Sequence, residues 1–70
     1  MKPINRQHYP ELDKILWDIH TQNIEPKLAF QCYEQRWQFV DQNKLNKQEK
    51  ELLEQLKNTL GNGLFMPANH

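Results

Sequence analysis

Asp13 and His20 lie four residues before and three residues after Trp17, so a helix would carry all three side chains on one face. A carboxylate beside an imidazole could begin an acid–base pair, but no nucleophile accompanies them in this pattern. We therefore predict no catalytic residues and no enzyme. We interpret Asp13, Trp17 and His20, with Tyr9 nearby, as a candidate interaction surface, because interaction hot spots combine an aromatic anchor with a polar rim.

Trp17 points about 150° away from the apolar stripe of its own predicted helix, so the helix does not need it for packing. Two interpretations remain open. The amino-terminal arm or the apolar run Leu64–Met66 could cover Trp17 within the fold, or Trp17 could be an exposed aromatic anchor with Leu64, Phe65 and Met66 nearby. We include all three in the candidate surface.

Arg36 falls inside the wide apolar arc of the segment 26–41, where a permanent cation needs an anion. We predict a buried ion pair that fixes how the helices dock, although capture of a carboxylate or phosphate from a partner is the alternative. The candidate internal partners are Asp13, Asp18, Asp41, Glu25 and Glu49.

The sequence contains no pattern that indicates a metal site or a cofactor site. The single cysteine, Cys32, lies on the apolar arc, where we expect a structural thiol. His8, His20 and His70 are far apart in sequence, and Gly61-Asn62-Gly63 follows a helix, whereas a phosphate-binding loop precedes one. We predict no metal and no cofactor.

Composition narrows the class of partner. The 70 residues hold 9 lysines and arginines against 9 aspartates and glutamates, and this neutrality disfavours nucleic acid. A nucleic-acid-associated regulator that uses Arg6, Lys44, Lys47 and Lys50 remains the alternative. No stretch is apolar enough to cross a membrane or to act as a signal peptide, so we expect a cytoplasmic protein.

These side chains must be positioned by helices. Apolar spacing predicts an all-α, three-helix bundle with helices at about 10–22, 26–40 and 47–60. Pro10 and Pro26 suit first helical turns, Asn46 is followed three residues later by Glu49 in the capping-box spacing, and Gly61 suits a left-handed C-terminal cap. The predicted single domain, 1–70, comprises an extended arm (1–9), the bundle (10–60) and an apolar tail (61–70).

The second helix has too wide an apolar arc for one neighbour, so we expect it in the centre. A small bundle has a marginal core, which favours a partner. The sequence therefore predicts a small cytoplasmic module that acts through protein–protein contacts, with another protein or with a second copy of itself.

Overall fold

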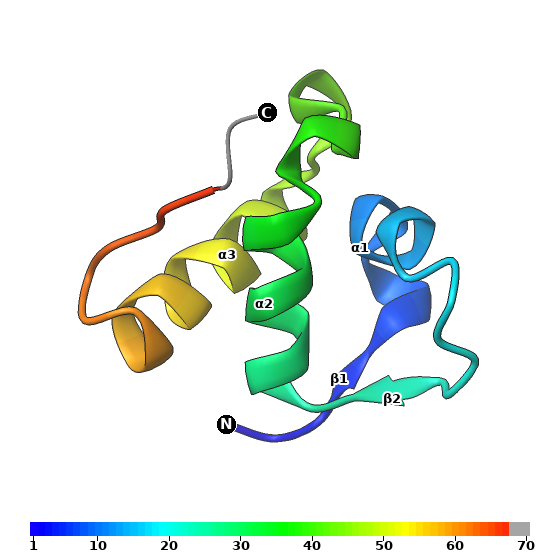
Figure 1. Cartoon of the computed structure of the whole chain (residues 1–70), viewed down its shortest axis with the longest axis horizontal. Coiled ribbons are helices and arrows are strands. Elements are labelled where there is room, and N and C mark those ends of the chain that lie inside the picture. Colours follow the sequence, from blue (N-terminus) through cyan, green and yellow to red (C-terminus); the bar gives the residue numbers. More distant parts are fainter. Residues whose placement is uncertain (68–70) are drawn as a thin grey trace.

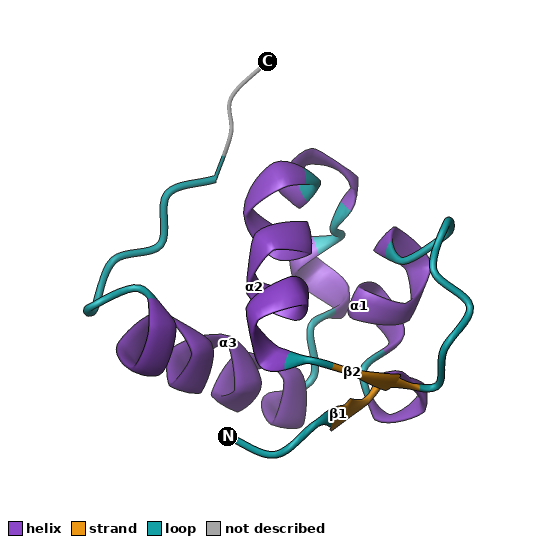
Figure 2. Ribbon diagram, turned by 60° about the horizontal axis from the view of Figure 1, so that its bottom comes forward, coloured by secondary structure: helices purple, strands orange, loops and turns teal. Residues whose placement is uncertain are grey.

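The computed structural model describes residues 1–67 and contains three helices and a small sheet (Figures 1 and 2). The strands and α-helices in chain order are β1 (Ile4–Asn5), α1 (Pro10–Ile15), β2 (Asn23–Ile24), α2 (Pro26–Gln35) and α3 (Lys47–Leu60). The three-helix prediction is confirmed, but the sheet was not predicted. The last residues of the predicted tail, 68–70 with His70, lie outside the described residues.

Helix α1 is shorter than the predicted span 10–22, because it ends at Ile15. The following residues, 16–22, form a loop that leads into β2. There Ile24 pairs antiparallel with Ile4 of β1, and both isoleucines are buried. The predicted arm is therefore not free: it folds into β1 and a 3₁₀ turn at Arg6–His8.

Helix α2 lies between α1 and α3 and packs against both, as its wide apolar arc predicts (Figure 1). It begins at Pro26, but it ends at Gln35 and not near residue 40. Arg36 leaves helical geometry with φ −118° and ψ 22°, and a 3₁₀ turn at Trp37–Phe39 follows. This break redirects the chain just where Arg36 sits.

Helix α3 spans the predicted residues, and the Asn46 side chain caps it by accepting a 2.8 Å hydrogen bond from the Glu49 backbone N–H. The predicted left-handed cap at Gly61 is wrong, because Gly61 has a φ of −105°. The left-handed residues are Asn62 and Gly63. Gly61 instead permits a close approach, since a Cβ there would lie 2.2 Å from the Leu64 carbonyl oxygen.

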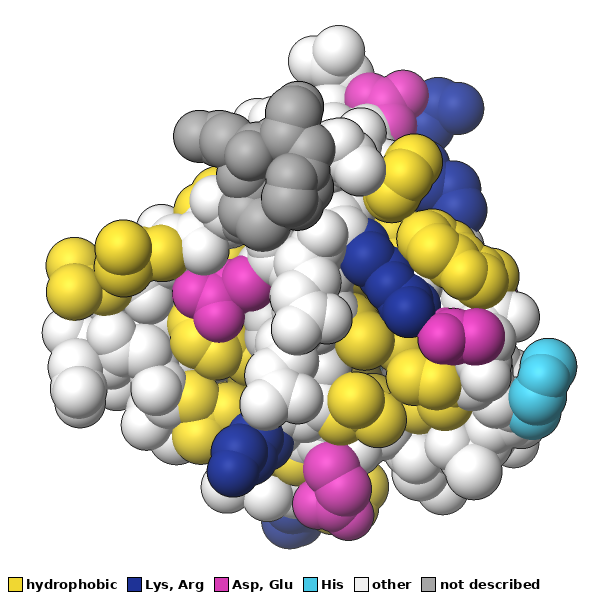
Figure 3. Space-filling model, in the orientation of Figure 1, with side chains coloured by type: hydrophobic (Ala, Val, Ile, Leu, Met, Phe, Trp, Pro, Cys, Tyr) yellow, Lys and Arg dark blue, Asp and Glu magenta, His cyan; other side chains and the backbone are white. Residues whose placement is uncertain are grey.

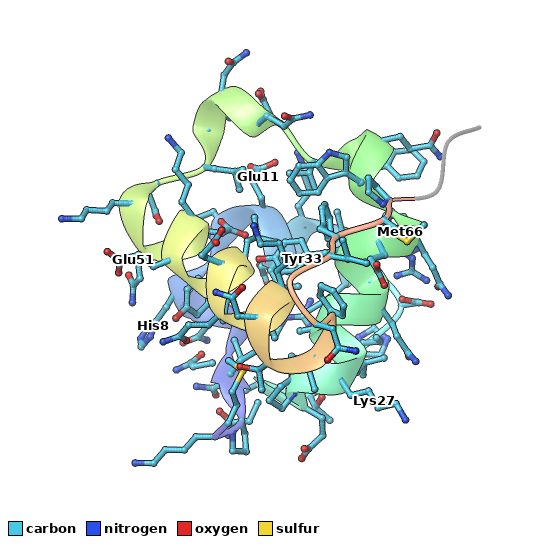
Figure 4. All side chains as sticks on the ribbon, turned by 90° about the vertical axis from the view of Figure 1, so that its left-hand side faces the viewer. His8, Glu11, Lys27, Tyr33, Glu51 and Met66 are labelled. Carbon is cyan, nitrogen blue, oxygen red and sulfur yellow. The ribbon has the colours of Figure 1, made fainter. Side chains whose placement is uncertain are left out.

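The core gathers apolar residues from all three helices and both strands around Tyr33. Tyr33 lies near the middle of the molecule in Figure 4, whereas Lys27 and Glu51 point outward. Cys32 is also buried, as predicted for a structural thiol, and burial raises its pKa.

Candidate functional site

Trp17 follows the last turn of α1 and is 54 % exposed, and the Arg36 side chain from the end of α2 lies over it. The guanidinium carbon is 4.3 Å from the centre of the Trp17 ring. This is a cation–π contact, in which the guanidinium charge is attracted to the face of the indole ring. The two most unusual positions in the sequence thus form one unit.

Arg36 also forms the ion pair that the sequence predicts, with Asp18 as its partner. Nη1 donates to Asp18 Oδ1 at 2.8 Å, and Nη2 donates to Oδ2 at 2.9 Å. Nη1 donates in addition to the Ile15 carbonyl at the end of α1. This bidentate bond lowers the pKa of Asp18 and raises that of Arg36.

The pair is not buried, which corrects the prediction for Arg36. The Arg36 side chain is 22 % exposed and the Asp18 side chain is 53 % exposed. Because α2 ends at Gln35, Arg36 leaves the packed arc of the helix and reaches the rim of the α1–α2 contact. It still joins the two helices, but it does so at the surface.

Phe39 completes the surface. Its ring meets Trp17 edge to face, at 5.4 Å between ring centres and 89° between ring planes, and Phe39 is 50 % exposed. We call Trp17, Asp18, Arg36 and Phe39 the Trp17 surface. Figure 3 shows basic and acidic side chains beside hydrophobic ones on the right-hand side of the molecule, where Figure 1 places α1 next to α2.

Asp13 and His20 come together but not around Trp17. Both line a shallow polar hollow with Arg6 and Ile19. The Asp13 carboxylate accepts a 2.5 Å hydrogen bond from Arg6 Nε, while His20 is exposed. The helix that should have placed them on the face of Trp17 ends at Ile15, and this is why the predicted row is broken.

Tyr9 and the tail also lie elsewhere. Tyr9 is half-buried against the core. In the tail, Phe65 packs between Trp37, at 5.0 Å between ring centres, and Phe30, at 6.0 Å. Leu64 and Met66 are exposed. The tail therefore docks on Phe30 and Trp37, and Trp17 stays exposed.

Glu49 has a role that sequence reasoning missed. It is fully buried, although it is charged. Its carboxylate accepts hydrogen bonds from the backbone N–H groups of Glu11 and Leu12, at 3.2 and 2.9 Å, and from the Tyr33 hydroxyl, at 2.6 Å. Glu49 thus caps α1 from another helix, so it is neither an Arg36 partner nor the second half of a capping box.

Arg6 caps the opposite end of α1. Its guanidinium donates to Asp13 and to the backbone carbonyls of four residues: Asp13, Leu16, Ile19 and Thr21. These contacts use all five of its N–H groups. Arg6 has no donor left for a phosphate in this structure. Of the residues in the nucleic-acid alternative, only Lys44, Lys47 and Lys50 could therefore contact phosphate.

Two further features are absent from residues 1–67. This part of the chain contains no group of three or more histidine, cysteine, aspartate or glutamate side chains placed to hold a metal ion. Over the same residues, no helix has the length and apolar character needed to cross a membrane.

Comparisons of the chain with protein-family models, with curated proteins and with solved structures found no match. The candidate site therefore rests on the geometry of this chain alone.

Proposed function

We propose that the protein is a small cytoplasmic binding module that acts through protein–protein contacts at the Trp17 surface. One observation carries the proposal: two large aromatic side chains, Trp17 and Phe39, are each about half exposed and held edge to face at 5.4 Å. Exposed aromatic clusters of this kind are typical of interaction hot spots.

The contacts of Arg36 within the surface support the same proposal. Arg36 is held by Asp18, by the Ile15 carbonyl and by the Trp17 ring, so the ring has a supported face. A side chain that is already ordered loses little conformational freedom on binding, and the free energy of binding is correspondingly more favourable.

The proposal involves no catalytic step, and it places the module in the cytoplasm. The carboxylate of Asp13, the acidic half of the pair considered for catalysis, is engaged by Arg6. The only cysteine of the chain is buried as a free thiol, which a reducing compartment preserves.

Affinity capture from an extract of the source cells tests the proposal. The tagged chain is compared with its Trp17→Ala variant and with Leu64→Ala, a matched control that also removes an exposed apolar side chain, 62 % exposed, but from the tail. We expect the wild type and Leu64→Ala to retain the same protein partner and Trp17→Ala to lose it. Equal capture by all three chains would contradict the proposal.

A further inference from the structure

We propose that the partner bound by the Trp17 surface is a second copy of this chain, which forms a symmetric dimer. This inference rests on the proposed function, because it uses the same surface and names what binds there.

The charges of the surface favour a second copy. The surface places one cation, Arg36, directly beside one anion, Asp18. A partner with charge of a single sign would attract one of these groups and repel the other. A copy related by a twofold axis presents its Asp18 to Arg36 and its Arg36 to Asp18, so both contacts are attractive.

Both charged groups retain hydrogen-bonding capacity. Nη1 of Arg36 donates to Ile15 and Asp18, and Nη2 donates once to Asp18. A guanidinium has five N–H groups, so within residues 1–67 the Nε–H and one Nη2–H remain for a second carboxylate. The half-exposed Asp18 carboxylate likewise keeps outward lone pairs. Two copies could therefore join their ion pairs into one network.

The aromatic pair supplies the apolar centre of this contact. Trp17 and Phe39 would meet the same two rings of the other copy, with the ion pairs at the rim, which is the usual anatomy of an interface. The chain carries 9 positive and 9 negative side chains, so two copies approach without net repulsion. Because the surface is small, we expect a weak dimer.

Sedimentation equilibrium of the full chain tests the inference over roughly 10 µM to 1 mM, the range in which a weak dimer dissociates. We expect the wild type and Leu64→Ala to pass from monomer to dimer. Trp17→Ala should weaken association at least tenfold, as truncation of a hot-spot residue does. Circular dichroism of each variant verifies that it is folded.

Charge exchange tests the symmetry itself. Asp18→Arg and Arg36→Asp should each abolish dimerisation, because each places like charges opposite one another in both halves of the contact. An equimolar mixture of the two variants should form a heterodimer, and the double variant Asp18→Arg/Arg36→Asp should again form a homodimer.

Two outcomes would overturn the inference: a wild-type chain that stays monomeric throughout this range, or single charge variants that associate as the wild type does. A monomeric wild type whose captured partner is still lost in Trp17→Ala would remove only the second copy as partner and leave the proposed function standing. Capture that is insensitive to Trp17→Ala would remove both.

Discussion

The guanidinium carbon of Arg36 lies 4.3 Å above the centre of the Trp17 ring, and the same guanidinium binds the neighbouring Asp18 through two hydrogen bonds. The residue after α2 therefore supports the aromatic ring that follows α1. Because α1 in turn is capped at one end by Glu49 and at the other by Arg6, the position of Trp17 depends on three distant side chains.

Trp17 should be open to solvent in the monomer, whereas Trp37, which packs against Phe65, should be protected. Each tryptophan can be measured alone, in Trp37→Phe and in Trp17→Phe. At low protein concentration we expect iodide to quench Trp17 fluorescence more strongly than Trp37 fluorescence. Equal protection of both tryptophans would mean that another part of the chain covers Trp17. This result would contradict the proposal that the Trp17 surface is exposed for binding.

Glu49→Ala should destabilise the fold by about 3 kcal/mol or more, because it leaves two backbone N–H groups and the Tyr33 hydroxyl without their acceptor. Urea denaturation measures this loss. The matched control, Tyr33→Phe, removes one donor and leaves Glu49 its two backbone partners, so about 1–2 kcal/mol is expected. If Glu49→Ala cost no more than Tyr33→Phe, the capping role of Glu49 would be refuted.

Arg6→Lys should destabilise the fold by roughly 2 kcal/mol, even though the charge is kept. An ammonium has three N–H groups, so it cannot satisfy the four backbone carbonyls that Arg6 binds, one at Asp13 in α1 and three in the loop 16–22. Thermal unfolding measures the loss. A melting temperature equal to that of the wild type would show that charge alone, and not the planar fork, holds the loop.

Acidification should destabilise the protein partly through Glu11. The Lys14 ammonium, helped by the Asp41 backbone N–H, holds the pKa of the Glu11 carboxyl below its ordinary value in the folded state. The unfolded chain then binds more protons in acid, so this stability is present above the ordinary pKa of Glu11 and is lost as the pH falls through the lowered value. Asp18, with its pKa lowered by Arg36, acts in the same direction.

We therefore expect the melting temperature of the wild type to fall between about pH 5 and about pH 2. Glu11→Gln should melt lower than the wild type at neutral pH, but it should lose less on acidification. Melting curves recorded by circular dichroism at several pH values provide the comparison. Parallel pH profiles for the two chains would rule out a contribution from Glu11.

The sequence predicted the helix boundaries that depend on the local pattern of residues. Pro26 and Asn46 mark the starts of α2 and α3, and the leucine spacing gave the full length of α3. The early end of α1 was missed because it depends on Arg6, which satisfies the carbonyls there from before the helix. The sheet was missed because two residues per strand carry too short an alternation to be detected.

The candidate site was predicted only in part, because its contacts join residues that are far apart in the sequence. A helical wheel shows that Arg36 needs an anion, but only the folded chain selects Asp18 and places Phe39 against Trp17. The sequence also holds a signal for Glu49. Glu49 occupies the same apolar stripe as Leu52 and Leu56, so it is a charge on a buried face just as Arg36 appeared to be.

Site-specific photocrosslinking in the source cells tests the central claim most directly. A photoreactive amino acid replaces Gln38, which is exposed beside Phe39, and the matched control replaces Lys27, which points outward from the start of α2 (Figure 4). We predict a discrete crosslinked protein product from position 38 that disappears when Trp17→Ala is added, and none from position 27. The absence of a product from position 38, or a product that persists in Trp17→Ala, would contradict binding through the Trp17 surface.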